Sequence, residues 1–148
     1  MSKEEHLLIF KNNTFEMLCL QAEASYPKEC CGILLGQQEN EQRIVHRIAS
    51  VENTAVEELS VAHFRIDPLA IYRVETTAEQ DGLEIVGFYH SHPDCSAVPS
   101  KEDIQHMIVG FSYPILSLQN GACVTVRSFE KILQTDTQIQ EEILIKEH

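Results

Sequence analysis

The sequence has few basic residues, no long hydrophobic run at its start and no segment rich in glycine or proline. Its 148 residues include 11 lysines and arginines against 23 aspartates and glutamates, a net charge of −12. Such a charge repels nucleic-acid backbones and anionic lipid, so we expect no nucleic-acid and no membrane role. With 43% hydrophobic residues, the composition is that of a globular protein rather than a disordered one.

The first ten residues lack the features of a targeting segment. Their apolar run, Leu7 to Phe10, covers four residues and has acidic neighbours. A signal peptide or a membrane-spanning helix needs a much longer apolar stretch. We therefore expect a cytoplasmic protein, and the length fits a single domain over residues 1–148.

The cysteines contain no paired CxxC motif. They are an odd, scattered set, which argues against a disulfide framework and a cysteine zinc knuckle. Reduced thiols are expected, with Cys19 on the apolar side of a helix and Cys123 as a small hydrophobic residue in a strand. The full set is Cys19, Cys30, Cys31, Cys95 and Cys123.

Hydrophobic spacing and capping signals predict three helices. The first covers residues 15–26, with a capping box at Asn13 and Glu16. The second covers 69–80 and follows Asp67-Pro68, an acid before a proline at the first helical position. The third opens at Ser100 and ends by residue 110.

Between these helices the pattern predicts strands. They cover residues 31–35, 43–50, 83–89, 115–119, 122–128 and 132–135, with a polar connection over 37–42 and a loop over 51–60. Asn120-Gly121 predicts a tight hairpin turn. Residues 137–148 fit either a packed edge strand or a short helix. The order predicts a sheet with helices on both faces.

Two histidines follow the strand predicted over 83–89. His90 and His92 are two residues apart, so on an extended strand both imidazoles emerge from one face, while Ser91 points to the other. An isolated pair of this kind is more often a surface feature than a metal site. Asp103 in turn fits a capping box with Ser100, but a carboxylate in the first helical turn also stays ionised, which suits a metal ligand.

Two imidazole nitrogens and one carboxylate oxygen form a tripod with an open fourth position, the arrangement of catalytic zinc sites. Zinc can lower the pKa of a water molecule from about 15.7 to about 7 and so generate a nucleophile at neutral pH. The pattern therefore points to metal-assisted hydrolysis. Mononuclear iron is the alternative metal for two histidines and a carboxylate.

These residues resemble the motif of the JAMM metalloproteases, the catalytic MPN-domain family. That motif is an upstream glutamate, then His-(Ser/Thr)-His-Pro, then Pro-Ser-x-x-Asp. The matching residues are Glu29, His90, Ser91, His92, Pro93, Pro99, Ser100 and Asp103. The likeness to short bacterial and archaeal members covers roughly residues 15–130 and includes Asn53 after the second predicted strand.

The resemblance implies a fold and a set of roles. The fold is α/β, a single domain with a curved, mixed, mostly antiparallel sheet flanked by helices, the MPN/JAMM and cytidine-deaminase-like α-β-α arrangement. His90, His92 and Asp103 would be the Zn²⁺ ligands, Glu29 the base that moves the proton of the attacking water, and Ser100 a donor to the oxyanion. Ser91 would orient the histidine segment.

The family hydrolyses amide bonds at the C-terminal tail of ubiquitin or ubiquitin-like proteins, and its compact prokaryotic members resemble enzymes acting on sulfur-carrier proteins that end in Gly-Gly. The resemblance thus implies a zinc peptidase or isopeptidase with such a protein as partner, and leaves a homodimer open. Three rival functions remain. They are a cysteine hydrolase using Cys30, Cys31 or Cys95, a catalytically silent MPN scaffold, and a DNA-repair-associated protein, which the charge disfavours. A Cys95 thiolate that silences the zinc is a further hypothesis.

Overall fold

The computed structural model describes residues 5–55, 65–135 and 137–147. Within them, seven strands form one closed barrel in the order β1-β3-β2-β4-β5-β6-β7. The strands are β1 (Leu7–Phe10), β2 (Cys31–Glu39), β3 (Gln42–Val51), β4 (Glu84–Pro93), β5 (Tyr113–Gln119), β6 (Ala122–Lys131) and β7 (Ile139–Lys146). The helices are α1 (Thr14–Ser25), α2 (Pro68–Gln80) and α3 (Lys101–His106).

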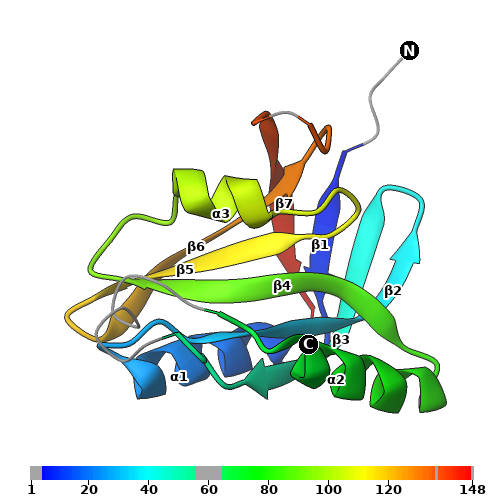
Figure 1. The fold of residues 1–148 in the computed structure, drawn as a ribbon, viewed down its shortest axis with the longest axis horizontal. Helices are drawn as coiled ribbons and strands as arrows, with labels where there is room; N and C mark the ends of the chain where they lie inside the picture. Colours follow the sequence, from blue (N-terminus) through cyan, green and yellow to red (C-terminus); the bar gives the residue numbers. More distant parts are fainter. Residues whose placement is uncertain (1–4, 56–64, 136, 148) are drawn as a thin grey trace.

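The sheet is mixed and mostly antiparallel. β1 pairs in parallel with β3 and β7, and β4 with β5, while the other four strand pairs are antiparallel. In Figure 1, α1 and α2 lie below the central strands and α3 lies above them, while α1 and α2 pack against opposite faces of β2. The predicted fold class is therefore confirmed. Among the described residues, no helix is both long enough and apolar enough to cross a membrane.

The central strands are buried on both faces, so hydrophobic clusters form on each face of the sheet. Leu18 and Ala22 of α1 pack into the largest cluster, with Leu34 of β2 and Tyr89 of β4. Ile33 of β2, on the opposite face from Leu34, belongs to the cluster under α2. A third cluster, beneath α3, contains Ala97, Met107, Tyr113, Ile115 and Phe129. Packing on both faces thus fixes the middle of the sheet, and with it the positions of side chains at the strand ends.

The predicted helices are present, with one correction. The capping box at Asn13 and Glu16 is wrong, because Asn13 has a left-handed φ of 63° and its side chain makes no capping hydrogen bond. The start of α2 is as predicted: the Asp67 carboxylate accepts a hydrogen bond from Leu69 N at 3.0 Å, with proline at the first helical position.

The strand predictions need more correction. The polar connection over 37–42 is wrong, because β2 continues to Glu39 and a two-residue turn leads into β3. The strand over 132–135 is wrong, since β6 ends at Lys131 and turn residues follow. The C-terminal segment is a strand, but not an edge, because β7 pairs with both β1 and β6. β1 was not predicted, and residues 56–60 of the predicted loop lie outside the described residues.

A buried polar cluster joins the strands that close the barrel. Arg43 of β3 donates through Nη1 to the carboxylates of Glu130 on β6 and Glu142 on β7, each at 3.2 Å. The hydroxyls of Ser112 and Ser128 donate to Glu142 at 2.8 and 2.7 Å. Burial raises the pKa of Glu142 to about 7, although both hydroxyls act in the opposite direction. The folded state therefore binds a proton at Glu142 more tightly than the unfolded chain does.

This raised pKa makes stability depend on pH. The contribution of protonated Glu142 is complete below the unfolded pKa of about 4.5 and is lost as the pH rises through about 7. Between these values we expect the free energy of unfolding to fall by on the order of 2 kcal/mol more in the wild type than in Glu142→Gln, measured by urea unfolding. Glu141→Gln, which alters a more exposed partner of Arg127 on the same strand, is the control and should keep the wild-type slope. Equal slopes in the wild type and Glu142→Gln would contradict the expectation.

Candidate metal centre

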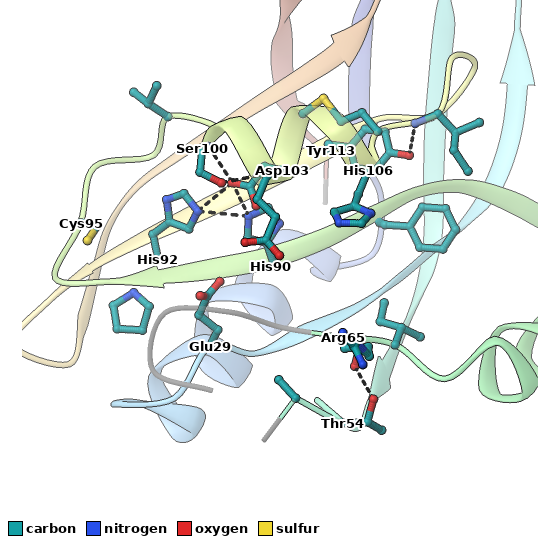
Figure 2. Close-up of a pocket in the computed structure, with 18 of the residues that line it drawn as sticks. Glu29, Thr54, Arg65, His90, His92, Cys95, Ser100, Asp103, His106 and Tyr113 are labelled. Carbon is teal, nitrogen blue, oxygen red and sulfur yellow. Dashed lines mark hydrogen bonds and ion pairs between the residues drawn. The ribbon is translucent and has the colours of Figure 1, made fainter. Parts of the chain in front are cut away.

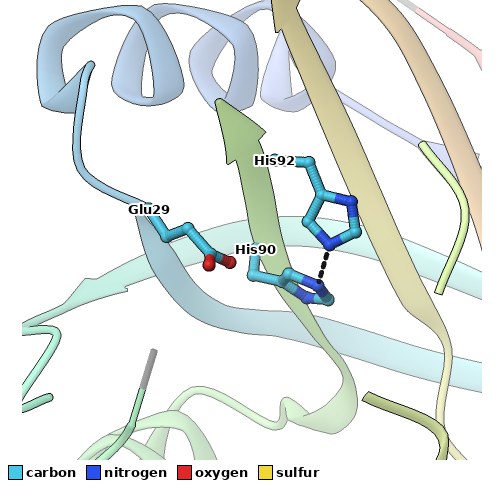
Figure 3. A group of neighbouring side chains, drawn as sticks. All are labelled: Glu29, His90 and His92. Carbon is cyan, nitrogen blue, oxygen red and sulfur yellow. Dashed lines mark hydrogen bonds between the residues drawn. The ribbon is translucent and has the colours of Figure 1, made fainter. Parts of the chain in front are cut away.

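The two histidines lie in the last part of β4, between β2 and β5. Both rings are on one face of the strand, with centroids 4.9 Å apart and the two Nε2 atoms 3.1 Å apart (Figure 3). Ser91, between them, is fully buried. The prediction that His90 and His92 share a face is confirmed.

Glu29 reaches the histidines because β2 and β4 are antiparallel. Cys31 pairs with the first histidine of β4, so the next step outward brings Cys30 opposite Ser91 and the one after brings Glu29 towards His92. Ser91 N donates to the Cys30 carbonyl oxygen at 3.0 Å, and Cys30 N donates to the Ser91 hydroxyl oxygen at 2.8 Å. One ligand atom from Glu29 and one from each histidine all lie within 4.8 Å of one another (Figure 3).

Asp103, in the first turn of α3, also faces the histidines. Its Oδ2 lies 3.3 Å from His90 Nε2 and 3.2 Å from His92 Nε2 (Figure 2). The same oxygen accepts a hydrogen bond from Ser100 N at 2.9 Å, and the Ser100 hydroxyl oxygen accepts one from Asp103 N at 3.0 Å. The capping box and the proximity to the histidines therefore occur together, because one carboxylate faces both.

The three closest atoms fit a small cation. His90 Nε2, His92 Nε2 and Asp103 Oδ2 form a triangle with sides of 3.1, 3.2 and 3.3 Å. A tetrahedral zinc ion with bonds of about 2.0–2.1 Å separates its ligand atoms by about 3.4 Å, close to these values. His92 Nδ1 lies 2.9 Å from the Ser96 carbonyl oxygen, and in the neutral tautomer that donates to this oxygen the Nε2 lone pair is directed at the site. The set with Glu29 in place of Asp103 is looser, which favours the tripod with Asp103.

Burial and hydrogen bonds set the charges of these groups. Burial lowers the pKa of His90, which keeps the imidazole neutral. Burial also opposes charge on His92, but hydrogen bonds to Asp103 and to the Ser96 carbonyl outweigh it and raise its pKa. The pKa of Asp103 is well below its usual range, since hydrogen bonds from the imidazoles outweigh the opposing effect of burial. Burial raises the pKa of Glu29 to about 8 against the attraction of His92, and a carboxyl group titrating near neutrality is suited to proton transfer.

The cluster opens into a cavity of about 760 Å³. Besides the site residues, its wall includes mostly apolar side chains from α2, β4, the start of β5 and the chain around α3. These include Ile71, Phe88, Val98, Met107, Ile108 and Tyr113. Val98 and Ile108 are about half exposed at 48% and 50%, so apolar surface lies next to the cavity. The cavity has room for a segment of polypeptide beside the cluster.

Asn53 connects Glu29 to the cavity wall, a role that the sequence did not indicate. Its Nδ2 donates to the Glu29 carbonyl oxygen at 3.0 Å. Its Oδ1 accepts from Ala55 N and Arg65 N, each at 3.0 Å, and both residues line the cavity. The sequence showed only that Asn53 follows a predicted strand, and the partners of its side chain are recognised only in three dimensions.

Two of the three candidate thiols are too well buried for nucleophilic catalysis. Cys30 and Cys31 are buried, and burial raises the pKa of both, that of Cys31 to about 12. Cys95 is exposed on the loop after β4 and lines the cavity (Figure 2). Ser100 lines the cavity, and since its oxygen accepts the capping bond, its hydroxyl proton can be donated to another group.

The chain matches the family described as prokaryotic homologs of the JAB domain over residues 11–130. It is similar to a desampylase of Pyrococcus furiosus, with 36% identity over 88 residues that cover 60% of this chain and 58% of that protein. It is also similar to a probable TtuB-protein conjugate cleaving protease of Thermus thermophilus, with 34% identity over 79 residues that cover 53% and 49% of the two chains. The matches thus span about half the length of these relatives.

Among solved structures, a JAB1/MPN domain protein from Archaeoglobus fulgidus superposes with a TM-score of 0.56 and 15% identity, covering 92% of this chain and 97% of that one. At this identity the likeness concerns the fold alone, and it confirms the predicted MPN/JAMM fold. The family match covers most of the sequence and contains Glu29, the two histidines, Ser100 and Asp103, so the chain belongs to the prokaryotic homologs of the JAB domain.

Proposed function

We propose that this protein is a zinc-dependent peptidase or isopeptidase that cleaves an amide bond at the C-terminal Gly-Gly tail of a ubiquitin-like or sulfur-carrier protein. The observation that carries the proposal is the triangle of His90, His92 and Asp103 atoms, with Glu29 beside it in one cavity. The names of two relatives, a desampylase and a probable conjugate cleaving protease, support the substrate class.

In this proposal His90, His92 and Asp103 hold the metal. A zinc ion there would supply Lewis acidity, which polarises the scissile carbonyl group and acidifies a water molecule. Support comes from the neutral state of His90, the ionised state of Asp103 and the size of the triangle. Iron suits two imidazoles and a carboxylate as well, so metal analysis of purified protein is needed to identify the ion.

Glu29 acts as the base. It is 5% exposed, and its carboxylate accepts a proton from the attacking water and returns it to the leaving amine. Ser91 and Asn53 both hold the peptide group that joins Glu29 to Cys30: Cys30 N donates to the Ser91 hydroxyl oxygen, and Asn53 Nδ2 donates to the Glu29 carbonyl oxygen. The Ser100 hydroxyl donates to the carbonyl oxygen of the substrate as negative charge develops there.

The tail of the partner enters the cavity in an extended form. Glycine has no side chain, so a Gly-Gly terminus lets the scissile peptide approach buried groups such as His90 closely. The folded part of the partner remains outside, next to the half-exposed side chains of Val98 and Ile108. Apolar side chains at the edge of a polar site are typical of surfaces that bind another protein.

The direct test is cleavage of a sulfur-carrier protein joined through its terminal glycine to a lysine side chain or to a peptide. We expect mass spectrometry to find the free Gly-Gly carboxylate, with activity lost after chelation and restored by Zn²⁺. Iodoacetamide should leave the rate within about twofold, because the proposed groups include no thiol. Activity that survives chelation but not alkylation would favour a cysteine hydrolase, and metal binding without any cleavage would favour a silent scaffold.

Replacing the base and a metal ligand should have separable effects. Glu29→Gln should keep the metal and lose about 10²–10⁴-fold in kcat, because it removes proton transfer only. Asp103→Asn should lose the metal, while its amide oxygen can still accept the Ser100 N–H that caps α3. Metal content is measured by elemental analysis and folding by circular dichroism. Glu102→Gln, an acid lining the same cavity, is the control and should keep both metal and activity. Full turnover by Glu29→Gln would exclude this residue as the base.

Ser100 has a structural and a chemical role that two substitutions distinguish. Ser100→Ala removes both the helix cap and the hydroxyl donor, so we expect a stability loss of about 1 kcal/mol and a 10²–10³-fold lower kcat. Ser100→Gly keeps an acceptable N-cap residue and should lose kcat to the same extent with nearly unchanged stability. Ser96→Ala retains the carbonyl that binds His92 and serves as control. If Ser100→Gly has wild-type kcat, the hydroxyl does not act on the substrate.

A further inference from the structure

Two cysteines that are distant in the sequence meet outside the metal centre. Cys19 on α1 and Cys123 at the start of β6 have their sulfur atoms 3.3 Å apart. Both side chains are partly buried and border the largest core cluster. A small rotation of either side chain brings two sulfurs at this separation to bonding distance. The proposed function makes no use of either thiol.

A second contact fixes the two cysteines relative to each other. Glu23 lies one helical turn after Cys19 on the same face of α1. Its carboxylate accepts a hydrogen bond from Cys123 N at 3.0 Å. α1 therefore contacts the same residue of β6 twice, through a sulfur and through the backbone. This double contact holds the sulfurs together in the reduced protein.

We infer that Cys19 and Cys123 form an oxidation-sensitive pair, which a peroxide converts into an intramolecular disulfide bond that joins α1 to the β5–β6 hairpin. Cytosolic disulfides are usually of this transient, redox-responsive kind. The closed loop runs from residue 19 to residue 123 and contains all five proposed site residues. Because none of these residues takes part in the oxidation, the inference does not depend on the proposed function.

The chemistry needs one equivalent of peroxide. The Cys123 thiolate attacks a peroxide oxygen, the O–O bond breaks, and a sulfenic acid and one water molecule form. The Cys19 sulfur then attacks the sulfenic sulfur, which forms the S–S bond and releases a second water molecule. Two thiols and one hydrogen peroxide thus give one disulfide and two waters. The hydrogen bond between the two sulfurs stabilises one thiolate of the pair, and exchanging the roles of the two residues leaves the balance unchanged.

The test is oxidation of the 148-residue protein with hydrogen peroxide, followed by alkylation in denaturant and peptide mapping by mass spectrometry. We expect a loss of two hydrogens, two fewer alkylated thiols, a peptide that links Cys19 to Cys123, and reversal by dithiothreitol. The oxidised protein should melt roughly 5–15 °C higher, because the bond closes a loop of about 100 residues.

Matched variants assign the bond. Cys19→Ser and Cys123→Ser should each abolish the linked peptide and the rise in Tm. Cys95→Ser, which alters the exposed thiol, should keep both. The inference is overturned if the Cys19 and Cys123 thiols of the wild type are still reduced after Cys95 has been oxidised. It is equally overturned if the recovered disulfide joins the Cys95 residues of two molecules. It is also overturned if Cys19→Ser still loses two thiols within one chain.

Discussion

The antiparallel pairing of Cys31 with His90 is the constraint on which the candidate metal centre depends. Once this register is set, each residue further back along β2 meets one further on along β4, and Glu29 arrives beside His92. A slip of one residue would turn the histidines to the face that Ser91 occupies, because side chains alternate along a strand. Ser91 opposes such a slip, since both its backbone and its buried hydroxyl bond to Cys30. A buried hydroxyl without its partner would cost free energy, so this contact selects one register.

The Asp103 carboxylate imposes the second constraint. One oxygen caps the backbone of α3 and also contacts both imidazoles. α3 has only six residues, and so short a helix depends strongly on its cap. The helix therefore cannot move relative to β4 without disturbing its own first turn. The arrangement combines the two sequence interpretations of Asp103, as capping residue and as candidate ligand.

The sequence predicted best the features that depend on neighbouring residues. The Asp67-Pro68 helix start, the Asn120-Gly121 turn and the shared face of His90 and His92 all follow from local chemistry. Features that depend on distant pairing were missed or misjudged. β1 is a short apolar run that becomes a strand only between β3 and β7, and the polar end of β2 is held by pairing with β3.

The site shows the same division. The spacing of the histidines and of Ser100 and Asp103 pointed to a metal from the residues alone. The residues alone did not indicate a role for Glu29, because only the pairing of β2 with β4 brings it near the histidines. Its expected role as a base came from the family resemblance. The contacts of Asn53 with both Glu29 and the segment before α2 are also long-range. A single sequence without a structure gives no sign of them.

The position of α1 links the metal centre to the thiol pair. Glu29 follows α1 by four residues, and Tyr26, just after the helix, donates a hydrogen bond from its hydroxyl to Asp94 at 2.5 Å. Asp94 comes two residues after His92, has a positive φ of 55°, and accepts a second bond from Asn120 N in the β5–β6 turn at 2.9 Å. These exposed bonds contribute little energy, but they fix where the chain leaves β4. A covalent bond between α1 and β6 would therefore fix the position of Glu29 relative to the histidine segment, through the backbone and without contacting the histidine rings.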